Sequence, residues 1–394
     1  MENMTSRERV MKALNHQPTD RIPIDIGGMH NLTTMHRDAY KNLQEYLGID
    51  ETAEISSPLS QSIQPNKFLR ERFHTDCYPL YFPLTEEQKN PIRLPDGSHT
   101  YADDWGITWR CPAGGLYFDP VTHPLEEAEI EDLDEYPWPG VYEDQVYEEL
   151  AAKAKDIREN TEYAIVMNGT LDGGTMLPAQ YMVGFEEFYT RLLIDEEFIE
   201  ALLEKIVEYQ CAQWDKVFEY AGEYIDIVRL SDDLGTQNAP LMSPNVFRKI
   251  IKPAQKKIVD HLRSLKPDLK LVYHCDGAVY QFLPDFIEMG YDAWNPVQVS
   301  ADGIDDTARL KREFGDKICF WGAGCDSQGV IARETPEVIR AEVRRRINDL
   351  AAGGGLIVGS IHNLQKDVPP ENMVAFYDAL YEYSVAYYEN GGKV

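Results

Sequence analysis

The segment LVYHCDG, residues Leu271–Gly277, is an apolar, β-prone run that ends in three residues able to bind a metal or carry a proton. Side chains alternate between the two faces of a strand, so His274 and Asp276 share one face and Cys275 lies on the other. A histidine two residues from a carboxylate can supply two ligands of an open zinc site, which needs a third protein ligand and leaves a fourth position for a substrate. His274 and Asp276 are therefore the first candidates for chemistry.

Short β-prone runs, most of them followed by a helical pattern, are the elements that would position these residues. Two of the helices have clear start signals, because Ser243 and Thr335 are hydroxyl residues that could cap a helix and each is followed by a proline. Strands and helices that alternate about eight times predict an α/β fold, a (β/α)8 TIM barrel, formed as a single domain by residues 1–394. The predicted strands are Arg21–Gly27, Asp76–Phe82, Ala164–Thr170, Asp226–Asp233, Leu271–Gly277, Ala293–Gln298, Ile318–Gly324 and Leu356–Asn363.

An insertion follows the second predicted strand, at about residues 83–140. Its first part, Ile92–Cys111, alternates around an Asp96-Gly97 turn signal and predicts an antiparallel β-hairpin. Its second part, His123–Gly140, is acidic and rich in proline. The insertion has too few apolar positions to close a second core, so we expect it to cover one mouth of the barrel.

The residues at the carboxyl ends of the predicted strands are almost all polar, and in a barrel of this kind the chemistry lies at those ends. We predict catalytic roles for Asp233, His274 and Asp276. We predict that the substrate is bound by Asp25, Asn168, Asp232, Asn295, Gln298 and Asn363. Two structural alternatives stay open, because Asp232 and Asp233 can instead cap the turn after their strand and His362 can be a core histidine.

The charge of the chain excludes several classes of partner. It carries 38 basic and 67 acidic residues, a net charge of −29, which repels nucleic acid and anionic membrane surfaces. The N-terminus has charges where a signal peptide needs an apolar core, and nowhere do 18 residues run apolar without charge. We therefore expect a cytoplasmic protein that binds neither nucleic acid nor a membrane.

Several of these segments resemble the uroporphyrinogen decarboxylase superfamily, which contains haem-pathway decarboxylases and methyltransferases that exchange methyl groups with corrinoid proteins. The resemblance covers nearly the whole chain in the family's order and implies a (β/α)8 barrel. The segments that carry it are TSRERVMKALNHQPTDRIPI, HPLEEAEIEDLDEYPWP, SDDLGTQNAPLMSPNVFRKIIKP, YHCDGAV, WNPVQVSADGID, FWGAGCDSQGVI and GGGLIVGSIHNLQKDVPPENM.

The methyltransferase branch is the better match. True decarboxylases carry an arginine-rich segment near the N-terminus that grips the substrate's carboxylates, whereas the corresponding stretch here has Arg37 alone. Methyltransferases of the family hold zinc through His-x-Cys after the fifth strand and another cysteine after the eighth. His274 matches that histidine, but Asp276 and Ser360 stand where the cysteines would be, which implies a harder site with a stronger Lewis acid. His362 or Cys325 could supply a third ligand.

The resemblance implies a corrinoid-dependent methyltransferase that moves a methyl group between a small methoxylated compound and a corrinoid protein. The chain has no Asp-x-His-x-x-Gly corrinoid signature, so a partner would carry the corrinoid. Zinc is the expected metal. In a metal-free alternative, Asp276 or Asp233 acts as a general acid and His274 holds it in place. The rivals are a decarboxylase-like lyase acting on a small acid and a non-catalytic barrel that binds a tetrapyrrole or a corrinoid protein. The resemblance to this family is also compatible with a homodimer.

Overall fold

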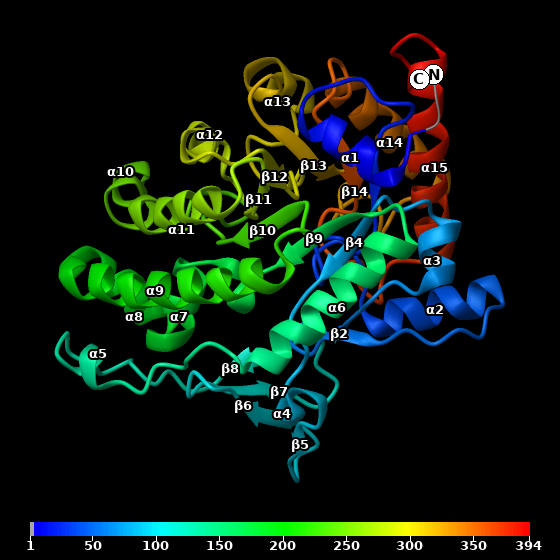
Figure 1. The fold of residues 1–394 in the computed structure, drawn as a ribbon. Helices are drawn as coiled ribbons and strands as arrows, with labels where there is room; N and C mark the ends of the chain where they lie inside the picture. The colour runs from blue at the N-terminus through cyan, green and yellow to red at the C-terminus, as the bar shows by residue number, and fades with distance from the viewer. Residues whose placement is uncertain (1–3) are drawn as a thin grey trace.

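The parallel strands form one sheet that curls into a nearly closed barrel (Figure 1). The computed structural model describes residues 4–394, and of residues 171 and 172 only the backbone is described. Neighbouring strands follow the order β1-β14-β13-β12-β11-β10-β9-β4, and each predicted run overlaps one of them, so the predicted barrel is confirmed. The strands are β1 (Ile24–Asp25), β4 (Cys77–Leu80), β9 (Ala164–Asn168), β10 (Ile227–Ser231), β11 (Lys270–His274), β12 (Ala293–Asn295), β13 (Cys319–Ala323) and β14 (Leu356–Gly359).

Helices surround the sheet and cover its outer face (Figure 1). Ser243 caps the helical segment that begins at Pro244, because its Oγ accepts from the Val246 N–H at 3.3 Å. The predicted start after Thr335 is also correct, but the Thr335 side chain makes no capping hydrogen bond. The longer helices are α1 (Ser6–Leu14), α2 (Arg37–Leu47), α6 (Asp144–Asn160), α7 (Met176–Val183), α8 (Phe185–Ile194), α9 (Glu196–Ala221), α11 (Lys252–Leu265), α13 (Thr307–Phe314), α14 (Pro336–Leu350) and α15 (Pro370–Glu389).

Shorter helical segments join these elements. They are α3 (Lys67–Arg72), α4 (Glu86–Lys89), α5 (Asp132–Glu135), α10 (Pro244–Val246), the π-helical turn Phe247–Ile251, α12 (Leu283–Met289) and two 3₁₀ turns, Thr170–Gly173 and Tyr280–Phe282. A two-stranded ribbon, β2 (Ile55–Ser57) and β3 (Ser62–Ile63), precedes α3. Among the described residues, no helix is both long enough and apolar enough to cross a lipid bilayer.

The helix α1 closes the amino-terminal end of the barrel. Its residues Val10, Ala13 and Leu14 are buried in one cluster with inward-facing strand residues, among them Val166 and Val272. Figure 1 places α1 and the antiparallel sheet of the insertion on opposite sides of the barrel strands. The carboxyl ends of the strands therefore face the insertion, where a site can open.

The insertion is an antiparallel sheet of four strands between β4 and α6. It consists of β5 (Ile92–Arg93), β6 (His99–Ala102), β7 (Thr108–Cys111) and β8 (Asp119–Pro120). The predicted hairpin is confirmed, because β6 pairs with both β5 and β7. Backbone hydrogen bonds join it to the rest of the chain. They run from Phe118 N to Leu59 O, between β2 and β3, at 2.8 Å and from Leu125 N to Met182 O of α7 at 2.9 Å.

The seam of the barrel lies between β1 and β4, where the residues before β4 hold β1. The Asp76 N–H donates to Ile24 O at 2.7 Å, and the Asp76 carboxylate accepts from Ile24 N at 2.8 Å. Thr75 Oγ1 accepts from Ile26 N at 3.0 Å. In the described part of the chain, no strand-to-strand hydrogen bonds join β1 to β4. Side-chain oxygens of Asp76 and Thr75 instead accept from the buried N–H groups of Ile24 and Ile26.

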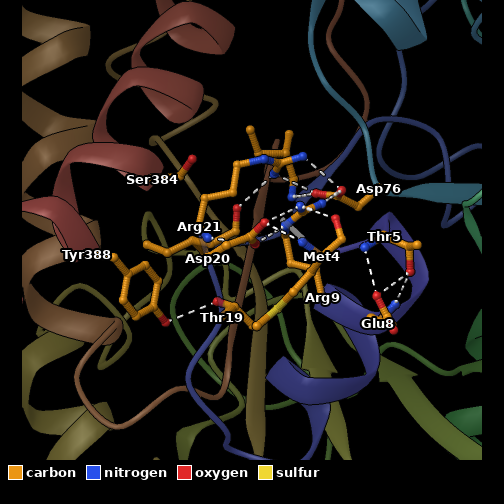
Figure 2. Close-up of polar contacts among 12 residues, drawn as sticks. Met4, Thr5, Glu8, Arg9, Thr19, Asp20, Arg21, Asp76, Ser384 and Tyr388 are labelled. Carbon is orange, nitrogen blue, oxygen red and sulfur yellow. Dashed lines mark hydrogen bonds and ion pairs between the residues drawn. The ribbon is translucent and has the colours of Figure 1, made fainter. Parts of the chain in front are cut away.

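A cluster of charges surrounds Asp76 at this seam (Figure 2). Arg9 Nη1 lies 2.6 Å from Asp76 Oδ1, and Arg21 Nη1 lies 2.7 Å from Asp76 Oδ2. Arg9 also pairs with Asp20, Nε to Oδ1, at 2.6 Å. The Asp76 side chain is fully buried, so the two guanidinium groups compensate a charge that has no access to water. Through Arg9, the cluster fastens α1 to the barrel.

Candidate metal centre

Three potential metal ligands converge at the carboxyl ends of β11 and β14. His274 is the last residue of β11, Asp276 lies two residues after it, and His362 lies in the loop after β14. Asp276 Oδ2 lies 3.7 Å from His274 Nε2 and 3.9 Å from His362 Nε2. The three ligand atoms lie within 4.8 Å of one another. We call these three residues the ligand cluster.

A hydrogen-bonded chain orients the His274 ring. Its Nδ1 lies 2.6 Å from Asn295 Oδ1, and Asn295 Nδ2 donates to Trp321 O at 3.0 Å. Because a carbonyl oxygen only accepts, the Asn295 amide nitrogen must face Trp321 and its oxygen must accept from His274. His274 therefore carries its proton on Nδ1, which leaves the Nε2 lone pair facing Asp276, as a metal ligand requires.

The electrostatics of the ligand cluster favour a bound cation. Burial lowers the pKa of His274 to about 4, so the imidazole is neutral near pH 7 and can bind a metal. Burial raises the pKa of Asp276, and Asp276 Oδ1 is buried without a hydrogen-bond partner among the described residues. A cation among the three ligand atoms would compensate the charge of the Asp276 carboxylate, whose Oδ2 lies nearest the two imidazoles. Two imidazoles and a carboxylate with an open position are a donor set that zinc accepts.

Asp233 lies next to the ligand cluster. Its Oδ1 accepts from the Asp276 N–H at 3.0 Å and lies 4.0 Å from His274 Nε2. Its side chain is 42% exposed, whereas that of His274 is 3% exposed. Asp233 thus holds the Asp276 backbone in place and is partly open to solvent.

The backbone around the site is strained at three neighbouring strand ends. Val297, Ala323 and His362 have φ angles of 59°, 54° and 61°, in the left-handed region that non-glycine residues rarely adopt. Val297 is β-branched, for which this region is a true outlier. Strain of this kind persists only where the surrounding structure imposes it, and it gathers at functional sites.

Two cavities open beside the ligand cluster. The first, which we call the His362 cavity, has a volume of about 540 Å³ and is lined in part by Tyr117, Asp276, Gln298, His362 and Asn363. The second, the Phe185 cavity, has a volume of about 490 Å³ and is lined in part by His123, Leu177, Tyr181, Phe185, Asp233 and Leu241. Asp276 and His362 of the ligand cluster line the first cavity, whereas the second is lined by Asp233, which accepts a hydrogen bond from the Asp276 N–H.

The structure brings His362, not Cys325, to the other two potential ligands. The Cys325 thiol is buried, and Glu342 and Arg346 of α14 are among the charges that act on it, so it faces the helical layer. Ser360, the second position where the family's methyltransferases have cysteine, is buried beside the Tyr377 hydroxyl of α15. Cys325 is thus not among the potential ligands that the structure brings together at this position.

Three residues predicted to bind substrate are buried and hydrogen-bonded to other parts of the fold, and none of them is among the described residues that line the two cavities. Asp232 accepts hydrogen bonds from Thr175 N at 3.0 Å and Leu177 N at 2.7 Å, so it caps the start of α7, the structural alternative left open by the sequence. Asp25 is fully buried and accepts from Trp321 Nε1 at 2.9 Å. Asn168 is also buried, and its Nδ2 donates to Gly28 O at 3.2 Å.

The other three predicted substrate-binding residues lie around the ligand cluster. Asn295 positions His274, as described above. Gln298 and Asn363 line the His362 cavity. Gln298 Oε1 accepts from Gly277 N at 2.8 Å, and Asn363 Nδ2 donates to Ser62 Oγ at 2.9 Å. Both side chains are therefore held in place, but both remain at the cavity wall.

Sequence reasoning missed two residues near the site. Tyr117, from the insertion, lines the His362 cavity and accepts from Gln365 Nε2 at 2.6 Å. No local signal marks it, because only the fold brings the insertion over the barrel. Arg229 is buried on β10, and its Nε donates to Asn168 Oδ1 at 2.9 Å. Arg229 is a charged residue inside the apolar run IVRLS, and a charge inside a buried strand is a signal that could have marked it as a candidate.

Asn295→Leu is expected to lower the affinity for zinc about 10-fold to 100-fold, the usual cost of losing the hydrogen bond that orients a ligating histidine. The substitution keeps the size of the side chain but removes the acceptor for His274 Nδ1. Zinc affinity can be measured by competition with a chromophoric chelator, with the far-ultraviolet circular dichroism of both proteins as a check of folding. An unchanged affinity would show that Asn295 does not orient a metal ligand.

Comparisons with known proteins agree with this architecture. The family model described as uroporphyrinogen decarboxylase (URO-D) matches residues 100–383. A uroporphyrinogen decarboxylase from Actinobacillus succinogenes is 38% identical over 402 residues, which cover 97% of this chain and 98% of the relative. One from Pseudoalteromonas atlantica is 24% identical over 404 residues, with 98% and 99% covered. Among solved structures, a methyltransferase from Methanosarcina mazei has the same fold, with a TM-score of 0.64 at 18% identity and with 97% and 99% of the two chains covered.

Proposed function

The chain belongs to the uroporphyrinogen decarboxylase family, and on that premise we propose that it is a methyltransferase acting between a small methoxylated compound and a corrinoid. The observation that carries the proposal is the ligand cluster of His274, Asp276 and His362, with the His274 Nε2 lone pair facing the other two. Breaking a methyl–oxygen bond leaves negative charge on the oxygen, and a site that places a cation there favours that reaction.

The residues of the ligand cluster would hold zinc, which when bound supplies a Lewis acid to the ether oxygen. The neutral imidazole of His274 would supply one nitrogen ligand, His362 would supply another, and Asp276 would supply one oxygen. Asp233 lies beside Asp276 and is partly open to solvent, so it can relay a proton from water to the oxygen that loses the methyl group. The corrinoid is the methyl acceptor in this direction, and because the chain has no corrinoid signature a partner protein would carry it.

The charges around the site support methyl transfer over decarboxylation of a porphyrinogen. A substrate with eight carboxylates needs cationic clamps, such as arginines that grip carboxylates with two hydrogen bonds. Arg333 is the one arginine or lysine among the described residues that line the two cavities, where Asp233, Asp276 and Asp367 also lie. Arg37 is 55% exposed and lies 3.9 Å from Asp38. The cavity walls thus carry three carboxylates and one guanidinium group, a charge that does not suit a substrate with eight carboxylates.

The proposal is tested by incubating the purified, zinc-loaded protein with methoxylated aromatic compounds and cob(I)alamin under anaerobic conditions. The expected result is loss of the cob(I)alamin absorbance with formation of methylcobalamin and an equal amount of demethylated product. Protein without a methyl donor serves as the control. If cobalamin is never methylated, the proposal is wrong. Release of carbon dioxide from small acids without cobalamin would instead identify a lyase.

A further inference from the structure

The insertion contributes a hydroxyl group to the cavity that the ligand cluster lines. Tyr117 belongs to the segment between β7 and β8, and it lines the His362 cavity together with Asp276 and His362. The N–H of the next residue, Phe118, donates to Leu59 O, so the backbone beside Tyr117 is held against the turn between β2 and β3. The Tyr117 side chain therefore reaches the cavity from a fixed support.

Two amide side chains surround the Tyr117 hydroxyl. Its oxygen accepts from Gln365 Nε2 at 2.6 Å. Its own proton can be donated to Asn363 Oδ1, but across 3.4 Å, which is long for a hydrogen bond from a hydroxyl. Asn363 Oδ1 also lies 3.0 Å from Gln365 Nε2 and 2.6 Å from His362 Nδ1, so closer groups already surround it. The Tyr117 proton is thus weakly held.

The tautomer of His362 decides which way these amides face. If His362 binds a metal through Nε2, its proton is on Nδ1 and Asn363 must present its oxygen to that proton. Gln365 must then present its nitrogen to the Asn363 oxygen, and the same nitrogen donates to Tyr117. In the other tautomer, Nδ1 accepts from Asn363 N, 2.9 Å away, both amides turn round, and Tyr117 donates to Gln365. Metal binding therefore leaves the Tyr117 proton available to a ligand.

A hydroxyl in this state suits an oxygen that gains negative charge. The short hydrogen bond that Tyr117 accepts from Gln365 polarises its O–H bond and makes the proton a better donor. Burial raises the pKa of Tyr117, and the Asp276 carboxylate raises it further, so the phenol keeps its proton near neutral pH. When a methyl–oxygen bond breaks, the oxygen keeps the bonding electron pair, and a hydrogen bond to that oxygen strengthens as the charge grows.

We propose that the Tyr117 hydroxyl donates a hydrogen bond to the substrate oxygen that loses the methyl group, so that the insertion supplies part of the catalytic site. The methyl group passes to the corrinoid and the electron pair stays on the oxygen. Tyr117 keeps its own proton, because the proton that neutralises the oxygen comes from water through Asp233. The inference rests on the proposed function, and it adds a contact that the ligand cluster alone does not supply.

The first experiment measures the binding of 4-nitrophenolate, whose charged oxygen represents the demethylated product. The dissociation constant is obtained from the visible absorbance of the probe, with zinc-loaded protein in a buffer that ionises the probe but not Tyr117. Tyr117→Phe is expected to weaken binding about tenfold to a hundredfold, the effect of one hydrogen bond to a charged group. Equal binding by both proteins, or no binding by the unaltered protein, would overturn the proposal.

The zinc content of Tyr117→Phe separates contact with the ligand from a structural role. It is expected to equal that of the unaltered protein, because Tyr117 is not among the potential metal ligands. Loss of zinc would show that Tyr117 acts by positioning His362 through Asn363, and the proposal would be wrong.

Tyr136→Phe is the matched control. Tyr136 also belongs to the insertion, and its hydroxyl donates to Trp105 O at 2.6 Å, but it is not among the residues that line the His362 cavity. It is expected to bind the probe as the unaltered protein does. An equal loss of affinity in both variants would mean that any weakening of the insertion has this effect, which would contradict a direct contact from Tyr117.

Binding is measured without cobalamin, so its outcome is independent of whether methyl transfer occurs. Affinity that depends on Tyr117, with cobalamin never methylated, would reject the proposed function and not the contact. Where transfer is observed, Tyr117→Phe is expected to lower kcat with little change in KM, because the contact strengthens only as charge develops. A higher KM with an unchanged kcat would contradict the proposal.

Discussion

His274→Ala is expected to remove the bound zinc and to lower the rate of methyl transfer about a hundredfold to a thousandfold, as loss of a preorganised electrostatic contact does. His274 is buried and neutral, and Asn295 fixes its Nε2 lone pair toward Asp276, so the alanine variant loses an oriented nitrogen ligand. Metal content is measured by inductively coupled plasma mass spectrometry, and the rate by the absorbance of cob(I)alamin. His261→Ala is the control, because His261 pairs with Asp215 on the surface.

The same experiment distinguishes the two candidates for the third ligand. His362→Ala is expected to lower the zinc content as His274→Ala does, whereas Cys325→Ala is expected to keep it, because Cys325 faces the helical layer. Full zinc occupancy in both histidine variants would contradict a metal centre at this position. His274 and Asp276 would then act on protons or bind substrate, and the proposed methyl transfer would lose its main support.

Asp76→Ala is expected to lower the free energy of unfolding by about 3–5 kcal/mol, the cost of removing one partner from a buried ion pair. The substitution leaves Arg9 and Arg21 without their shared carboxylate and removes the acceptor for Ile24 N (Figure 2). A loss of this size is a large part of the total stability of a protein. Equilibrium unfolding in urea, followed by tryptophan fluorescence, measures it.

Glu86→Ala provides the matched control for Asp76→Ala. Glu86 pairs with Lys89 at 2.9 Å, but their side chains are 75% and 49% exposed. Exposed pairs contribute about 0–1 kcal/mol because solvent screens them, so a small change is expected. If Asp76→Ala changed the unfolding midpoint no more than Glu86→Ala does, the charge cluster would not be what closes the seam of the barrel.

Local patterns in the sequence were enough to predict the elements of the fold. Apolar β-prone runs that alternate with helical patterns gave every barrel strand, and the Asp96-Gly97 turn gave the hairpin of the insertion. Alternation along the strand also predicted that His274 and Asp276 point to the same place, while Cys275 points away. These features depend on residues close together in the chain, where backbone geometry sets the direction of each side chain.

Only the tertiary structure decided which distant residues complete the site. The choice of His362 over Cys325 depends on which way each side chain turns after its strand, and the strained backbone at His362 is not visible in its residue type. Asp232 and Asp233 are neighbours of the same type, yet one caps α7 and the other reaches the ligand cluster. The sequence by itself determined which residues stand at the strand ends. The residues that they contact lie on other strands and loops, so closure of the barrel decides which of them come within reach of one another.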